Sequence, residues 1–232
     1  MLLSVAFCPP TSWFAAAARD FTLSPDRVIP SQVTLEACEH FQKQSYRNRC
    51  RILTANGIEN LQVPVVHGDN LYRTPIRDVR VDYATPWIPK MERAVSSAYE
   101  SSAYFFHYRD DFFAILESMP PTLWELDLAL IRFFLAKTGL AVTFQPTGTF
   151  ERTPQGDADP VRTERRGGNL AEGEDFREVI HPKRPNGILR SLDLEKPYFQ
   201  VFAGKYGFQS DLSVMDLLFN EGPDSILYLK KL

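Results

Sequence analysis

The chain has 232 residues, of which 44% are hydrophobic and 24% are charged, and its formal net charge at pH 7 is −3. This length suits one large domain or two small ones, and the composition is that of an ordinary soluble globular protein with a substantial core. The slightly acidic balance argues against general nucleic-acid binding, which leaves a basic surface across a domain. Any anion site must therefore be local.

The sequence predicts neither an export signal nor a membrane span. Residues 1–10 lack a basic start, and their apolar run is too short for a secretory signal. The longest apolar window, residues 123–144, contains four charged residues, which a membrane span would exclude. The three cysteines have no CxxC spacing, which suits a reducing compartment. We therefore expect a cytoplasmic protein.

The N-terminal part of the chain is expected to form mainly strands. Residues 2–7 are a short apolar strand that Pro9 and Pro10 stop, after which Thr11 or Ser12 can cap a helix. Short runs of β-forming residues follow at 27–30, 32–37 and 49–66.

A hairpin is the firmest local prediction. The third run contains Asn56-Gly57, a dipeptide that supplies the two positive φ angles of a type I′ turn. Residues 76–83 alternate apolar and charged side chains imperfectly, and a further strand is expected there, ending before Pro86.

Helical patterns dominate the middle of the chain. Apolar residues recur at intervals of three and four over residues 87–101 and 104–117. Thr122 is expected to cap a third helix, which runs to about Thr138 and is closed by Gly139.

The last part of the chain is less regular. A strand is expected at 140–146, and residues 151–187 then mix charges of both signs with glycine and proline, so they are either disordered or a functional excursion. After an extended aromatic segment, Asp211 is expected to cap a helix, which Gly222-Pro223 ends before a final short helix.

These elements predict one α/β domain over residues 1–232. An N-terminal strand–helix and β-hairpin sheet is packed with a central group of helices, and a C-terminal helix docks back onto them.

Residues 40–51 read HFQKQSYRNRCR and concentrate four cations. As a strand, this stretch would place Arg47, Arg49 and Arg51 on one face; as a helix, it would align Lys43, Arg47 and Arg51. We prefer the strand, because the hairpin needs a partner. Guanidinium groups bind phosphate and carboxylate in a bidentate manner, so the stretch suits a phosphorylated or nucleotide-linked ligand. The alternative is a solvated sheet face whose arginines pair with carboxylates such as Glu36, Asp78 or Asp82.

Asp127 conflicts with the pattern of its own helix. At 100° per residue, it falls in the middle of the apolar face made by Leu123, Leu130, Ile131 and Phe134. A buried carboxylate must be paired, hydrogen-bonded or protonated. Asp127 is therefore either a structural partner of a core group or an acid that faces a ligand.

Common catalytic motifs are absent from the sequence. It contains no GxGxxG after a strand, no GxxxxGK[ST], no HExxH and no GxSxG. The spacing of Cys38, Glu39, His40 and Cys50 matches no standard zinc site, so no metal is predicted.

Other reactive side chains stay open at this point. Cys8 and Cys50 are possible nucleophiles, with a histidine as base, although buried inert thiols are more common. His181 lies with Lys183 and Arg184 in the sequence IHPKRP, within the irregular stretch. This second cationic cluster is either a lid over an anion or a solvated linker.

Five motifs, in order and covering nearly the whole chain, resemble the WbqC-like protein family in its shorter form. They are FCPPTSWFAA, EHFQKQSYRNRCRI, DFREVIHPK, PYFQVF and LSVMDLLFNEGP. The sequence departs from the family at Cys8, where members usually carry an aromatic residue, and in a longer, more charged stretch before Asp175.

What the resemblance implies is limited, because the family is largely uncharacterised. Some members are encoded in O-antigen and other surface-polysaccharide clusters, a glycine transferase role is suggested for one branch, and no catalytic residue transfers. The family's characteristic positions are Pro9, Pro10, Phe14, Gln42, Lys43, Tyr46, Arg47, Asn48, Arg49, Pro182, Lys183, Tyr198, Gln200, Phe208, Asn220 and Glu221. A fixed order of polar residues at 42–49 favours a ligand site over a solvated strand.

We therefore expect a transferase of surface-polysaccharide biosynthesis that acts on an anionic small molecule, which is phosphorylated, nucleotide-activated or aminoacyl in type. Asp127 or His40 would be its acid or base. The residues expected to bind the ligand are Gln42, Lys43, Tyr46, Arg47, Asn48, Arg49, Trp13, His181 and Lys183. The alternative is a non-enzymatic protein that binds a small molecule or a partner in an envelope or polysaccharide system. The sequence does not identify the substrate, a cofactor or the oligomeric state.

Overall fold

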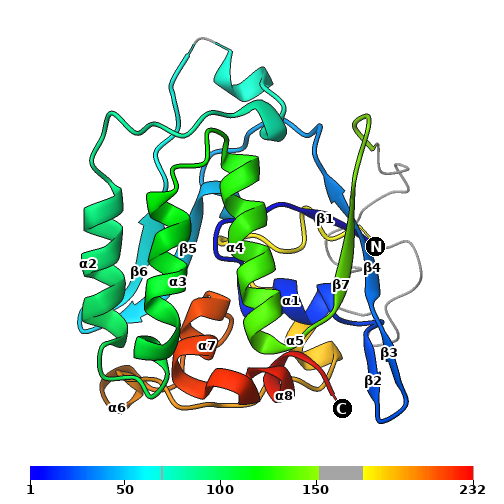
Figure 1. The fold of residues 1–232 in the computed structure, drawn as a ribbon, viewed down its shortest axis with the longest axis vertical. Coiled ribbons are helices and arrows are strands. Elements are labelled where there is room, and N and C mark those ends of the chain that lie inside the picture. Colours follow the sequence, from blue (N-terminus) through cyan, green and yellow to red (C-terminus); the bar gives the residue numbers. More distant parts are fainter. Residues whose placement is uncertain (69, 152–174, 232) are drawn as a thin grey trace.

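A computed structural model describes residues 1–68, 70–151 and 175–231 (Figure 1). Three strands form a parallel sheet with β4 in the middle: β1 (Leu2–Ser4), β4 (Ser31–Glu36) and β7 (Val142–Pro146). The strands expected in these regions are confirmed. Because parallel strands run in one direction, their carboxyl ends lie at the same edge of the sheet.

Antiparallel hairpins make up the other described strands. β2 (Thr22–Ser24) pairs with β3 (Arg27–Ile29), and β5 (Arg49–Thr54) pairs with β6 (Gly57–Gln62). The second hairpin confirms the expected turn but not its type. Its loop residues are Ala55 and Asn56, and neither has a positive φ. The positive φ, of 101°, lies at Gly57, the first residue of β6. A type I′ turn needs a positive φ at both loop residues, so that detail was wrong.

The long helices pack side by side across Figure 1 and confirm the helical prediction for the middle of the chain. They are α2 (Ile88–Tyr99), α3 (Phe105–Glu117) and α4 (Leu123–Thr138). At the end of α4, Gly139 has a φ of 74°, the left-handed conformation that terminates many helices.

The start of α4 is fixed by a reciprocal cap. The Thr122 hydroxyl accepts a hydrogen bond from the Glu125 N–H at 3.2 Å, and the Glu125 carboxylate accepts one from the Thr122 N–H at 3.2 Å. Replacing Thr122 by alanine is expected to lower the free energy of unfolding by about 0.5–2 kcal/mol, whereas Thr122→Ser keeps the hydroxyl and most of the stability. Urea denaturation of both variants measures the difference; equal losses would contradict the cap.

Two buried helices link the parallel sheet to the long helices. Every residue of α1 (Thr11–Ala17) is buried, and so is every residue of α7 (Val214–Glu221) except Glu221. α1 contacts β4 and α7, while α7 contacts α3, α4 and β5, so the sheet, the hairpin and the helices share one core. The remaining short helices are α5 (Ile188–Ser191), α6 (Ala203–Tyr206) and α8 (Ile226–Leu229). The expected α/β class is confirmed.

Asp211 does not cap the helix that follows it. Ser213 caps α7 instead, and the Asp211 carboxylate accepts hydrogen bonds from the Ser12 N–H at 2.8 Å and the Thr11 hydroxyl at 3.3 Å. It therefore caps α1, which begins directly after Pro10 without a cap of its own. The sequence prediction of both caps was wrong because the true partner lies at the other end of the chain.

The strand expected at residues 76–83 is also wrong. Ile76–Asp78 form a short 3₁₀ helix, and Arg80 and Val81 make only isolated bridges, to Thr122 and Val65. Residues 152–174 of the predicted excursion lie outside the described residues. None of the described helices is long and apolar enough to cross a membrane.

Candidate functional site

The carboxyl edge of the parallel sheet carries a group of buried polar side chains. β1 ends at Ser4, β4 ends at Glu36, and Thr147 directly follows β7. In open parallel sheets, ligands bind in the crevice outside this edge, where the loops that leave neighbouring strands separate. The sheet topology therefore identifies this edge as the first place to look for a site.

Glu36 is fully buried and holds several segments together. Its carboxylate accepts hydrogen bonds from the Thr147 hydroxyl at 2.6 Å, from the backbone N–H groups of Cys38 and Glu151, and from Nη1 of Arg177 at 3.0 Å. Arg177, which is 7% exposed, also donates from Nη2 to Asp175 at 2.6 Å. Asp175 and its neighbour Phe176 pair with Leu2 of β1, which brings this cation over the sheet edge.

A second buried ion pair lies beside the first. Arg47 is 3% exposed and donates from Nε and Nη2 to the two oxygens of Glu39, at 2.9 and 2.5 Å. Its guanidinium also donates to the Gln42 amide oxygen at 3.1 Å and to the Ser4 hydroxyl at 3.0 Å. This bidentate geometry fixes the plane of the guanidinium and leaves few ways for it to turn.

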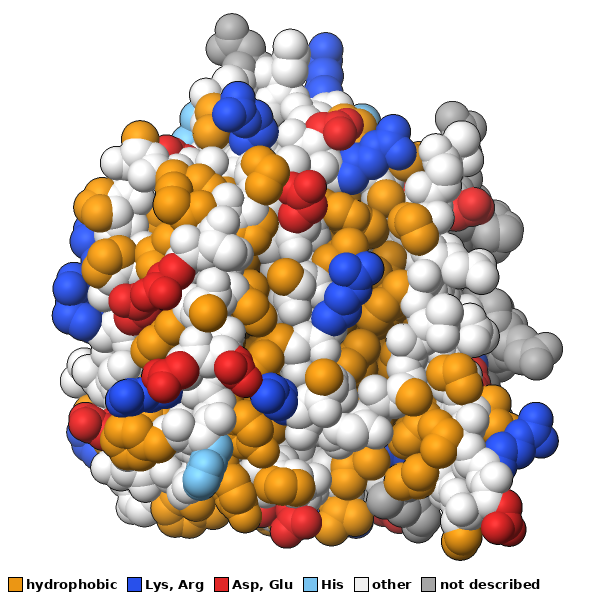
Figure 2. Space-filling view, in the orientation of Figure 1, with side chains coloured by type: hydrophobic (Ala, Val, Ile, Leu, Met, Phe, Trp, Pro, Cys, Tyr) orange, Lys and Arg blue, Asp and Glu red, His pale blue; other side chains and the backbone are white. Residues whose placement is uncertain are grey.

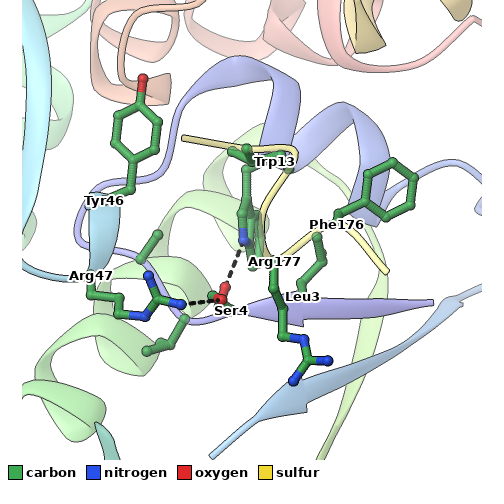
Figure 3. Close-up of a pocket in the computed structure, with 10 residues that line it drawn as sticks. Leu3, Ser4, Trp13, Tyr46, Arg47, Phe176 and Arg177 are labelled. Carbon is green, nitrogen blue, oxygen red and sulfur yellow. Dashed lines mark hydrogen bonds between the residues drawn. The ribbon is translucent and has the colours of Figure 1, made fainter. Parts of the chain in front are cut away.

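Arg47 and Arg177 line the same small cavity, from opposite sides in Figure 3. Trp13 also lines it and donates from its ring nitrogen to the Ser4 carbonyl at 2.9 Å. Tyr46 is a further lining residue, and its hydroxyl points away from Arg47. The space open to a water-sized sphere is about 10 Å³. That is room for about one water molecule, so a larger ligand can bind only at the mouth or by displacing side chains.

The two cationic clusters of the sequence meet next to the cavity, beside the Gln42 side chain that Arg47 bonds, on a surface that we call its mouth. The Gln42 amide donates to Glu178 at 3.3 Å, and the ammonium of Lys183 donates to the side-chain oxygen of Gln44. Partial burial and the guanidinium of Arg184 lower the pKa of His181, and the charge of Arg47 adds to the effect. His181 is therefore mostly neutral at pH 7, and the rim's positive charge comes from Lys183 and Arg184.

Left-handed backbone at non-glycine residues occurs at several places in the described chain. The residues are Cys8, Gln44, Met119, Asp193 and Asp211, with φ values of 41°, 59°, 51°, 56° and 55°. Gln44 accepts a hydrogen bond from Lys183, so it is the one that belongs to the contacts described above. The strain is therefore spread over the fold and does not by itself locate a site.

The other residues predicted at positions 42–49 point elsewhere. Lys43 is exposed, with Nζ 4.8 Å from the ring centre of Tyr72. The Asn48 amide donates to the Val63 carbonyl at 2.9 Å, and Arg49 donates to Gln62 at 3.3 Å. Asn48 and Arg49 thus bond to the end of β6 and the residue after it, and none of the three side chains lines the cavity.

The predicted strand row of three arginines was wrong. Tyr46–Asn48 form a 3₁₀ helix that Ser45 caps, and β5 begins only at Arg49. Arg47 is therefore turned into the sheet edge, while Arg49 and Arg51 stay on the hairpin.

Asp127 is fully buried, as its position on the apolar face of α4 predicted. Neither carboxylate oxygen has a hydrogen-bond partner among the described residues. Burial raises the pKa of Asp127 well above its ordinary value, and the neighbouring Cys50 raises it further. Burial also raises the pKa of the Cys8 thiol, which interacts with Cys50. These groups lie in the core, outside the cavity lining.

His40, the other predicted acid or base, is exposed, and its backbone bridges to Pro75. Among the described residues, no group of three or more histidine, cysteine, aspartate or glutamate side chains could hold a metal ion.

Comparison with protein-family models supports the resemblance of the motifs. The model of the WbqC-like protein family matches residues 31–228, most of the chain. The chain belongs to the WbqC-like family. A relative, "Uncharacterized protein Rv1507c" of Mycobacterium tuberculosis, is 27% identical over 199 residues, which are 82% of this chain and 84% of that protein. No solved structure matches the chain.

In this WbqC-like protein, the sequence prediction left three of these polar residues out of the site: Ser4, Glu36 and Arg177. Glu36 was considered only as an ion-pair partner of the arginines at 47–51. A carboxylate at the last position of an apolar strand was a usable signal for Glu36. Arg177 stood among residues of both charges, and nothing in its sequence neighbourhood indicated that it would be buried.

Proposed function

We propose that this protein is a transferase that holds the anionic group of a phosphorylated, nucleotide-activated or aminoacyl small molecule at the mouth of the Arg47–Arg177 cavity. The observation that carries the proposal is the convergence of two segments far apart in sequence at the carboxyl edge of the parallel sheet. Because some members of the family are encoded in surface-polysaccharide clusters, O-antigen-type biosynthesis is the proposed setting.

The buried arginines act in this proposal as a fixed base for the site. Glu39 already pairs with Arg47, and Glu36 and Asp175 pair with Arg177, so neither cation has to be neutralised by a ligand. The ammonium of Lys183 lies on the exposed rim and can exchange its contact with Gln44 for a charge-assisted hydrogen bond to an anion. Tyr46 and Trp13 give the cavity aromatic walls.

A non-enzymatic binding protein is the second candidate, and the state of the acids favours it. A catalyst needs an acid or base within about 3 Å of the reacting group. Asp127 is enclosed in the core, and the described carboxylates of the cavity are engaged with arginines. Two histidines remain as candidate bases: His40, which is exposed, and His181, which is half-exposed.

Binding is tested by thermal shift against nucleotide sugars, nucleoside triphosphates and amino acids. A ligand at a hundredfold excess over its Kd stabilises the protein by about 2.7 kcal/mol. The Lys183→Ala variant is expected to weaken binding about tenfold, because a charge-assisted hydrogen bond contributes about 1.5–3 kcal/mol. Lys196→Ala, which removes another exposed lysine, is the matched control.

If Lys183→Ala and Lys196→Ala bind the ligand with equal Kd values, the site lies elsewhere. If no compound shifts the melting temperature of the wild type, the proposed ligand classes are wrong. Incubation of a confirmed ligand with candidate acceptors, followed by mass spectrometry, separates a transferase from a binder. A transferred group is expected for the first, and unchanged ligand for the second.

A further inference from the structure

One edge of the parallel sheet is unoccupied by the described chain. Ser31 N–H bonds to the Ala141 carbonyl and Thr147 N–H to the Leu35 carbonyl, so the odd-numbered residues of β7 turn their backbone groups toward β4. Backbone direction alternates along a strand, so Val142 and Phe144 turn their N–H and C=O groups outward. No described residue bonds to these groups.

The opposite edge of the same sheet is covered. Asp175 bridges to Leu2 of β1, and the Phe176 N–H bonds to the Leu2 carbonyl at 3.0 Å. Proteins usually blunt an exposed edge with lysine, an inward charge or a bulge, and β7 has only Pro146 at its last position. The edge is therefore open for pairing along Val142–Gln145.

A shallow groove runs beside this edge, between β7 and α4. It has a volume of about 480 Å³, and its apolar lining includes Leu135, Leu140, Val142 and Phe144. Figure 2 shows the strip of hydrophobic side chains over these elements, with basic side chains among them. Arg132 of α4 also lines the groove; it is exposed and makes no ion pair with any described residue. An unpaired guanidinium above an apolar strip favours an acidic group flanked by apolar ones.

We propose that β7 and this groove bind an extended segment of a partner protein, which adds a fourth strand to the parallel sheet. Main-chain hydrogen bonds to Val142 and Phe144 would supply the pairing, and side chains at alternate positions of the segment would enter the groove. The segment would carry apolar, acidic and apolar residues at positions i, i+2 and i+4, with the acid on Arg132.

The outward backbone groups of β7 are the reason why we propose a peptide as the occupant. A fatty acid or another amphipathic small molecule could use the apolar strip and Arg132, but it would leave the outward N–H and C=O groups of β7 unpaired. A peptide strand satisfies both features at once.

A display library of ten-residue peptides, selected on the full chain, tests the proposal. Selection is expected to enrich the alternating apolar–acidic–apolar pattern. Binding of an enriched peptide should weaken about tenfold or more in Arg132→Glu, because the charge-assisted hydrogen bond is lost and a repulsion replaces it. Arg93→Glu, which reverses an exposed arginine of α2, is the matched control and should bind as the wild type does.

Hydrogen exchange tests the edge itself. In the free protein, the amides of Val142 and Phe144 should exchange quickly and those of Thr143 and Gln145 slowly; the peptide should protect the first pair. Val142→Pro removes one outward N–H without breaking a bond to β4, and should weaken binding while the fold is kept. The proposal is overturned by a lack of enrichment, by equal binding to Arg132→Glu and Arg93→Glu, or by protection that leaves Val142 and Phe144 unchanged. Sedimentation that shows a dimer through this edge would assign it to a second copy and overturn it as well.

Discussion

Replacing Glu36 by alanine is expected to lower the free energy of unfolding by about 3–5 kcal/mol, the cost of breaking a buried ion pair from one side. The carboxylate receives the Arg177 guanidinium, the Thr147 hydroxyl and the N–H groups of Cys38 and Glu151. Its loss takes the acceptor away from the buried guanidinium of Arg177 and the buried hydroxyl of Thr147. Because domains are stable by about 5–15 kcal/mol, the variant should lose a large fraction of its stability.

The size of this loss in unfolding free energy distinguishes a buried network from an exposed ion pair. Urea denaturation of Glu36→Ala measures it, with Glu178→Ala as control, since the Glu178 side chain is 62% exposed in its contact with Arg184 and such pairs contribute about 0–1 kcal/mol. Glu36→Gln should fall between them, because it keeps an acceptor for Thr147 and loses the charge that faces Arg177. A loss below about 1 kcal/mol in Glu36→Ala would show that water replaces the carboxylate, and that the cavity edge is open to solvent.

Replacing Asp127 by asparagine is expected to stabilise the protein at neutral pH. Burial and Cys50 raise the pKa of Asp127 far above the value of about 3.9 that it has when unfolded. The folded state therefore binds a proton more tightly than the unfolded state does. This contribution to stability is complete below about pH 4, and it is lost progressively as the pH rises toward the raised pKa of the folded state.

The loss amounts to about 1.4 kcal/mol for each pH unit between the two pKa values, and asparagine, which does not titrate, removes it. Denaturation curves at pH 5 and pH 8 should therefore show a smaller fall in stability for Asp127→Asn than for the wild type. Asp110→Asn, at an aspartate whose side chain is 81% exposed, is the control and should follow the wild type. An unchanged fall in Asp127→Asn would mean that the carboxylate is already ionised and paired in the folded protein.

Local signals were enough to predict the elements whose contacts are local. Thr122, Glu125 and Gly139 define both ends of α4 within the helix itself, and the burial of Asp127 follows from its place on the apolar face. The hairpin was predicted because its turn and both strands are adjacent, although the turn type depended on which residue took the positive φ.

Features that depend on distant partners could not be predicted in this way. The position of Arg47 depends on Glu39 and on Ser4 of the first strand, and that of Arg177 on Glu36, none of which its own neighbours indicate. The parallel pairing of β1, β4 and β7 could not be predicted either, because many registers are possible for short apolar strands far apart in sequence. The sequence therefore singled out residues 42–49 and 181–183 as site candidates without indicating how they are arranged.

The cap of α1 by Asp211 bears on how the newborn polypeptide matures. Thr11 and its partner Asp211 are 200 positions apart, and the neighbouring Thr11 N–H bonds to the Leu212 carbonyl. At a translation rate of about 5–20 residues per second, roughly 10–40 s pass between the synthesis of these two residues. α1 therefore acquires its cap only after residues 211 and 212 have been made, so its docking is a late step in the maturation of the chain.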